Sequence, residues 1–158
     1  MGKVGIPDHV LNKPGALTDD ERAWIQEHPI VGEDIVGRAP SLRDALTVIR
    51  QHHERYDGGG YPDGIAGEEI SLAARIVSVA DVWDALTSDR AYRPAWPPDR
   101  ALAYMEADRG GHFDPRCLDA FLALMAERGH RPGGRAADPA PAGDSCHEQP
   151  SAEALPAP

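Results

Sequence analysis

The chain has 158 residues, a hydrophobic content of 41%, an aromatic content of 6% and a formal net charge of −10, which together predict one small domain with a modest core. The acidic balance argues against a nucleic acid polymer as a partner, because phosphate binding depends on clustered Lys and Arg. Two cysteines, no secretory signal and no apolar run of the roughly 18 residues that cross a bilayer predict a cytoplasmic protein without a membrane partner.

The first clear helix signal begins at Thr18, which forms a capping box with Glu21 three residues later. This helix leads to His28. Pro29 follows immediately and is expected to break or kink the helix, because proline lacks the backbone N–H that a helix interior uses. A second turn or helix is then predicted over residues 30–36.

The next helix is predicted over residues 41–53, with Ser41 as its N-cap. Apolar residues recur along it at helical spacing. They are Leu42, Ala45, Leu46 and Ile49. The helix ends at the adjacent pair His52 and His53, which leads into a glycine-rich turn over residues 58–64.

A longer apolar helix is predicted over residues 73–86. Its buried face is expected to carry four residues at helical spacing. They are Ile76, Val79, Ala80 and Trp83. Asp81 lies inside this apolar segment, and a buried carboxylate is costly unless a cation or hydrogen bonds compensate it.

Two core-forming helices complete the predicted domain. The first follows two consecutive prolines, and the second runs over residues 114–128 with Asp114 as N-cap and Pro115 at the first helical position. His112 and His130 each lie beside a glycine, and we interpret them as ordinary cap or surface histidines.

The last part of the chain differs sharply in composition. Residues 131–158 are mostly Pro, Ala and Gly, and Leu155 is their only large aliphatic residue. Such a segment buries too little apolar surface to offset the entropy of ordering. We therefore predict an all-α domain over residues 1–130, without strand-type alternation, and a disordered tail over residues 131–158.

The run over residues 52–64, His-His-Glu-Arg-Tyr-Asp-Gly-Gly-Gly-Tyr-Pro-Asp-Gly, resembles the signature of the HD-GYP proteins. These are a bacterial branch of the HD metal-dependent phosphohydrolases, and they hydrolyse cyclic di-GMP. Further segments match the family in the same order: 2–8, 11–15, 27–29 and 79–93. The resemblance implies a helical bundle of the HD-domain type.

The family's His-Asp pair would lie two residues before Gly2 and Lys3, but the sequence starts at Met1. The resemblance therefore implies an HD-GYP domain that is incomplete at its N-terminus, because the helices that precede the pair are also absent. We expect such a chain to hydrolyse its substrate slowly or not at all.

By resemblance, the metal ligands are His28, His52, His53 and Asp81. A complete domain would hold two or more iron or manganese ions, with Asp81 as a bridging and catalytic ligand. Adjacent helical residues point about 100° apart, so His52 and His53 are expected to serve different ions. The residues alone leave open helix-end roles for all three histidines.

The resemblance also implies a set of substrate contacts. Lys3 matches a lysine that contacts the phosphate and assists the leaving oxygen, and Arg90 and Arg93 match residues that bind substrate phosphates. The residue at the position of Arg93 is often lysine in the family. Arginine would replace the compact charge of the lysine ammonium group with a planar guanidinium group that can donate two parallel hydrogen bonds. The glycine loop is expected to lie over the site and to offer Gly60, Tyr61 and Pro62.

These features predict a metal-dependent phosphodiesterase that hydrolyses cyclic di-GMP. Two other functions stay open: a non-catalytic signalling or cyclic-dinucleotide-binding module, and a phosphohydrolase that acts on another nucleotide. A second copy of the chain or a signalling protein is the expected protein partner.

Overall fold

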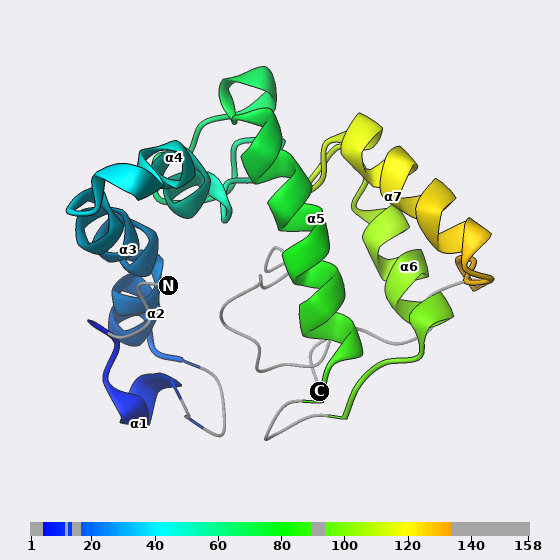
Figure 1. Cartoon of the computed structure of the whole chain (residues 1–158). Coiled ribbons are helices and arrows are strands. Elements are labelled where there is room, and N and C mark those ends of the chain that lie inside the picture. The colour runs from blue at the N-terminus through cyan, green and yellow to red at the C-terminus, as the bar shows by residue number, and fades with distance from the viewer. Residues whose placement is uncertain (1–4, 12, 14–16, 90–93, 134–158) are drawn as a thin grey trace.

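The computed structural model describes residues 5–11, 13, 17–89 and 94–133. Helices dominate these residues, and no strand occurs among them, which confirms the all-α prediction (Figure 1). The helices are α1 (Asp8–Leu11), α2 (Asp19–Gln26), α3 (His28–Gly37), α4 (Arg43–Gln51), α5 (Leu72–Thr87), α6 (Pro98–Ala107) and α7 (Pro115–Glu127). Within the described part of the chain, no helix has the length and apolar character needed to cross a membrane.

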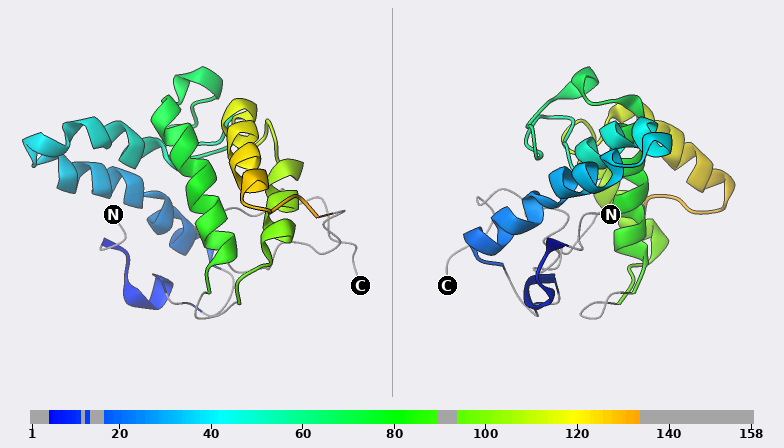
Figure 2. Two further views of the ribbon diagram at one scale, coloured as in Figure 1. Left: turned by 45° about the vertical axis from the view of Figure 1, so that its right-hand side comes forward. Right: turned by 60° about the vertical axis from the view of Figure 1, so that its left-hand side comes forward.

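Helix α5 lies at the centre of the molecule, with α3 and α4 on one side and α6 and α7 on the other (Figure 1). Helices α3 and α4 run side by side (Figure 2). Two clusters of buried apolar side chains occur among the described residues. One joins α5, α6 and α7 through Val79, Val82, Met105, Phe113 and Leu118. The other consists of Ile6, Val10, Leu17 and Ile25.

The predicted helix start at Thr18 is confirmed. The backbone N–H of Glu21 donates to Thr18 Oγ1 at 3.3 Å, and the N–H of Thr18 donates to Glu21 Oε2 at 2.7 Å. The predicted break at Pro29 is also confirmed, because α2 ends at Gln26 and a new helix begins at His28. Pro29 lies in the first turn of α3, where its missing N–H costs no hydrogen bond.

Helix α4 begins later than predicted, and Ser41 is not its N-cap. Ser41 lies in a short 3-10 turn over Pro40–Leu42, and Leu42 precedes α4 without a side-chain cap. Pro40 favours this tight turn because its fixed φ suits the first position. By contrast, the prediction for α7 is confirmed, since Asp114 accepts a hydrogen bond from the N–H of Arg116 at 2.8 Å.

The buried face of α5 differs from the predicted one. Ile76 is 53% exposed and Ala80 is also exposed, whereas Val79 is buried as expected. The side chains that α5 buries are Ala74, Ser78, Val79, Val82 and Ala85. The helix is apolar around most of its circumference, so periodicity alone did not select the packed face.

His112 is not a surface residue. It is 8% exposed, and its Nε2 lies 3.0 Å from the buried Ser78 Oγ. His130 is half-buried just after α7, where its N–H donates to Met125 O at 3.0 Å, as expected of a cap residue. Of the predicted tail, residues 134–158 lie outside the described residues, and Gly133 N–H donates to Asp99 O at 3.0 Å.

Candidate metal centre

Three histidines that are far apart in the sequence meet where α3 begins and α4 ends. His28 is the first residue of α3, and His52 and His53 follow the last residue of α4. One ligand atom from each ring lies within 4.8 Å of the other two. The Nε2 atoms of His28 and His53 are 3.1 Å apart. The packing of α3 along α4 thus brings together three of the four predicted metal ligands.

Backbone carbonyls orient two of these rings. His28 Nδ1 lies 2.6 Å from Ile25 O, and His52 Nδ1 lies 2.8 Å from Ile49 O. A carbonyl only accepts hydrogen bonds, so each Nδ1 carries a proton, and in the neutral ring the lone pair is then on Nε2. This is the arrangement in which a protein fixes the tautomer of a metal-binding histidine.

The chemistry of this donor set fits a transition metal. Neutral imidazole is a good ligand for iron, zinc, copper and nickel, and His28 and His53 are only 3% and 6% exposed. His52 and His53 were expected to diverge by about 100° as neighbours on a helix. They lie instead in the turn after Gln51, where their ring centroids are 4.0 Å apart and their ligand atoms reach the same region.

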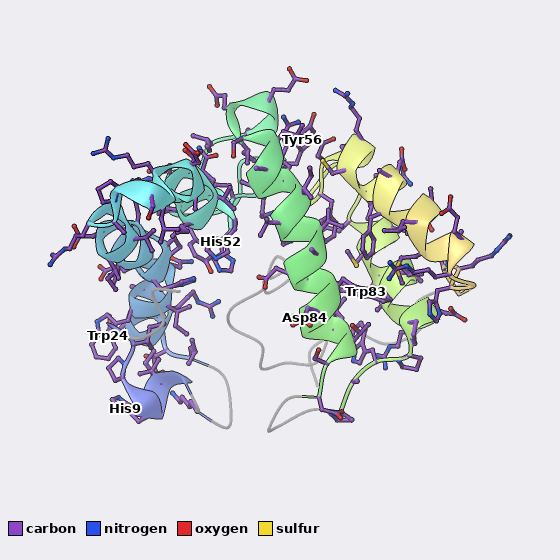
Figure 3. The ribbon with its side chains drawn as sticks, viewed as in Figure 1. His9, Trp24, His52, Tyr56, Trp83 and Asp84 are labelled. Atoms are coloured by element: carbon purple, nitrogen blue, oxygen red, sulfur yellow. The ribbon has the colours of Figure 1, made fainter. Side chains whose placement is uncertain are left out.

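Asp81 lies on α5 and is half-buried. It is not part of the described group of three residues whose ligand atoms converge. Figure 3 shows His52 extending from the end of α4 toward α5, and Asp84 on the side of α5 that faces the first helices. Asp81 precedes Asp84 by three residues, which places it about 60° round the same helix.

Glu54 follows the histidine pair and is almost completely buried, at 2% exposure. Its Oε1 accepts hydrogen bonds from the N–H of Asp63 at 2.7 Å and from the N–H of Gly64 at 3.2 Å. Its Oε2 is buried and has no hydrogen-bond partner among the described residues. Burial raises the pKa of this carboxyl, against the lowering effect of the loop N–H groups. Glu54 is part of the sequence motif, but no role was predicted for it from the sequence.

The glycine loop packs directly against His53. A Cβ on Gly60 would lie 2.3 Å from Arg55 N and 2.6 Å from His53 O, so only glycine fits this approach. The N–H of Tyr61 donates to His53 O at 3.2 Å. The Tyr61 ring stacks on the His53 ring, with centroids 4.9 Å apart and planes inclined by 19°. Pro62 follows and is half-buried.

Ion pairs attach the far end of the loop to the helices. Arg50 donates twice to Asp63, with both distances 2.7 Å, and once to Glu33 at 2.6 Å. The hydrogen bonds from Arg50 lower the pKa of Asp63, and those to Asp63 and Glu33 raise the pKa of Arg50. The loop is therefore fixed to both α3 and α4.

A recess of about 270 Å³ adjoins His28 on the side of the first described residues. Its other lining residues are Gly5, Ile6, Pro7, Trp24, Glu27 and Val31. Its volume lies just below the range of about 300–1,000 Å³ typical of small-molecule pockets, so it has room for part of a nucleotide. The predicted phosphate-binding residues Lys3, Arg90 and Arg93 lie outside the described residues.

Comparison with known proteins identifies the family. The sequence profile described as "HD domain" matches residues 1–117. The chain is 53% identical over 129 residues to the cyclic di-GMP phosphodiesterase response regulator RpfG of Xanthomonas campestris pv. campestris, in a match that covers 80% of this chain and 34% of that protein. It is 46% identical over 131 residues to a cyclic di-GMP phosphodiesterase of Vibrio cholerae, covering 78% of this chain and 27% of that protein.

A solved structure supports the fold. A cyclic GMP-AMP specific phosphodiesterase of V. cholerae, V-cGAP3, superimposes with a TM-score of 0.57 at 24% identity, over 70% of this chain and 25% of that one. The chain thus spans about a third or less of the length of the relatives that it matches. The resemblance to the HD-GYP phosphodiesterases is confirmed, and the chain belongs to the HD domain family.

Proposed function

We propose that this chain carries the histidine centre of a metal-dependent phosphodiesterase of the HD-GYP type, which hydrolyses cyclic di-GMP. The observation that carries the proposal is the convergence of His28, His52 and His53, with ligand atoms within 4.8 Å of one another. The chain that holds them is 53% identical over 129 residues to a protein named as a cyclic di-GMP phosphodiesterase.

The proposed ligands are the three histidines and Asp81, which would together hold two or more iron or manganese ions. Mixed imidazole and carboxylate donors suit both metals. Bound ions would activate water and neutralise charge on the phosphodiester. The ordered Nδ1 contacts of His28 and His52 keep their rings in the ligating tautomer, so these residues need no rearrangement to bind.

The remaining roles concern the substrate. We assign Lys3 to the scissile phosphate and the leaving oxygen, and Arg90 and Arg93 to the substrate phosphates. The loop residues Gly60, Tyr61 and Pro62 would border the bound ligand. We place this activity in the cytoplasm, with a second copy of the chain or a signalling protein as partner.

The assay measures release of the linear dinucleotide and GMP with added iron or manganese. It uses this chain and a form extended to include the family's His-Asp pair. We expect slow or no turnover by the chain itself and metal-dependent turnover by the extended form. His52→Ala and Asp81→Ala should each abolish turnover, because loss of a ligand disturbs both water activation and phosphate orientation.

Two further variants of the extended form separate binding from chemistry. Arg90→Ala should mainly raise KM, because it removes a phosphate contact and leaves the metal ligands in place. His130→Ala changes a histidine at the end of α7, outside the cluster, and should leave turnover unchanged. If the metal-replete extended form binds cyclic di-GMP but never cleaves it, the chain is better described as a cyclic-dinucleotide-binding module.

A second substrate is favoured by a specific observation. The chain is 41% identical over 125 residues to a V. cholerae protein named as a 3'3'-cGAMP-specific phosphodiesterase. Because identity is higher to two proteins named as cyclic di-GMP phosphodiesterases, at 53% and 46%, we expect a larger kcat/KM for cyclic di-GMP. Parallel assays with both dinucleotides decide between them, and a larger kcat/KM for 3'3'-cGAMP would reverse the assignment.

A further inference from the structure

The most unusual group near the metal centre is the buried carboxylate of Glu54. It is 2% exposed, one oxygen accepts two loop N–H groups, and the other oxygen has no hydrogen-bond partner in the part of the chain that the structure describes. Burying a carboxylate with one unsatisfied oxygen is costly, since the lost hydration is only partly replaced. The hydrogen bonds from the backbone N–H groups of Asp63 and Gly64 offset part of this cost and connect the Glu54 side chain to the loop.

The loop that Glu54 holds also makes three contacts with the segment containing His53. Gly60 fits against the backbone of residues 53–55 without room for a side chain. The N–H of Tyr61 donates to His53 O at 3.2 Å, and the Tyr61 ring stacks on the His53 ring at 4.9 Å. Any shift of the loop would move the Tyr61 ring relative to the imidazole.

Several contacts orient the three rings of the centre. His28 and His52 each have Nδ1 on a carbonyl of the preceding helical turn. His53 has its Nε2 3.1 Å from His28 Nε2 and also lies face to face with Tyr61, at an interplanar angle of 19°. Tyr61 belongs to the loop that Glu54 contacts, so the position of this loop influences the orientation of the His53 ring.

We propose that Glu54 is a positioning residue, which fixes the loop over residues 58–64 so that Tyr61 sets the orientation of His53 at the metal centre. Glu54 itself needs no contact with a metal or a substrate in this arrangement. The inference rests on the proposed function, because it assigns His53 to a metal.

The first test uses the metal-free chain. Glu54→Gln keeps an acceptor for the N–H groups of Asp63 and Gly64, whereas Glu54→Ala removes it. In Glu54→Ala, amide hydrogen exchange at these two residues should accelerate, and the His53 ring protons should lose the upfield NMR shift caused by the Tyr61 ring. In Glu54→Gln both signals should stay close to those of the unchanged chain. Unaltered exchange and ring shifts in a folded Glu54→Ala would overturn the inference.

The second test measures metal affinity by cobalt(II) absorption. Loss of a residue that orients a ligand weakens metal binding by roughly 10 to 100-fold, and we expect this loss of affinity for Glu54→Ala and Tyr61→Ala. For the conservative variants Glu54→Gln and Tyr61→Phe, we expect the affinity to fall by less than about threefold. If Glu54 acts through Tyr61, the double variant Glu54→Ala/Tyr61→Ala should bind no more weakly than the weaker single variant. Fully additive losses would show that Glu54 acts independently of Tyr61 and would contradict the inference.

Circular dichroism and thermal melting establish that each variant is folded at the assay temperature. If Glu54→Ala does not fold, Glu54→Asp retracts the acceptor by one methylene and replaces it in both tests. A chain that binds cobalt but hydrolyses nothing in its extended form contradicts the proposed function and leaves this inference intact. If Glu54→Ala and Tyr61→Ala bind cobalt as tightly as the unchanged chain, this inference is contradicted and the proposed function is not. A chain that binds no cobalt is judged by the exchange and ring-shift results.

Discussion

At Gly60, the loop backbone lies so close to the backbone of residues 53–55, just after α4, that no side chain fits between them. An added Cβ would lie 2.3 Å from the backbone N of Arg55, whereas at Gly59 the nearest atom would be the side-chain Oδ1 of Asp57 at 3.2 Å. We expect Gly60→Ala to lower the free energy of unfolding by about 3 kcal/mol or more, and Gly59→Ala by less than about 1 kcal/mol. Denaturant unfolding measures both free energies, and equal values would show that the loop does not pack against the backbone of residues 53–55.

The residues of the candidate site that belong to a recognisable sequence motif could be predicted as ligands from the sequence. The histidines at 28, 52 and 53 were identified from sequence, and the structure brings their ligand atoms within 4.8 Å. The position of Glu54 was not predictable, because its partners are backbone N–H groups of Asp63 and Gly64, which carry no residue-type signal. Stacking of Tyr61 on His53 likewise depends on how the loop folds back, which local sequence does not specify.

At the scale of single helices, capping signals predicted the starts of α2 and α7 but not that of α4, and periodicity did not predict the packed face of α5. Thr18 and Asp114 cap α2 and α7 because a short polar side chain satisfies a free N–H within its own turn. The packed face of α5 depends on distant partners in α6 and α7. Ala74 and Ala85, which are buried there, carry weaker apolar signals than the exposed Ile76.

The capping box of α2 should make stability depend on pH. A hydrogen bond from Lys13 and another from the N–H of Thr18 lower the pKa of Glu21 from 4.5 to about 2. Because the folded-state pKa is lowered, the stabilisation is present above pH 4.5 and is lost as the pH falls toward 2. We expect Glu21→Gln to lower Tm at pH 7, and the difference from the unchanged chain to shrink across this range.

Thermal melts of both proteins at several pH values test this expectation. Asp34→Asn is the matched control, because Asp34 pairs with Arg38 on the exposed surface of α3, where ion pairs contribute little. Its Tm should follow that of the unchanged chain. A constant difference for Glu21→Gln from pH 7 to 3 would mean that the Glu21 carboxylate charge does not stabilise α2.

At the scale of the molecule, several large apolar side chains of the described residues are exposed, and the two clusters of buried apolar side chains found among those residues are small. Three of the exposed side chains lie on α5: Leu72 at 57%, Ile76 at 53% and Val77 at 37%. Helix α4, described over its full length, has no fully buried residue. Exposed apolar surface gathered on one helix favours association with other apolar surfaces.

We therefore expect the purified chain to self-associate, with the exposed side of α5 in the contact. Ile76→Lys should weaken association by roughly tenfold or more, since burial of an isoleucine side chain contributes about 1.5–3 kcal/mol. Ala73→Lys is the control, because it adds the same charge at an exposed position of the same helix without removing a large apolar group. Sedimentation velocity over a range of concentrations measures both. Association that persists in Ile76→Lys would show that the contact lies elsewhere on the molecule. A chain that stays monomeric at every concentration would contradict the expectation, because its exposed isoleucine and leucine side chains would then remain in water without a partner.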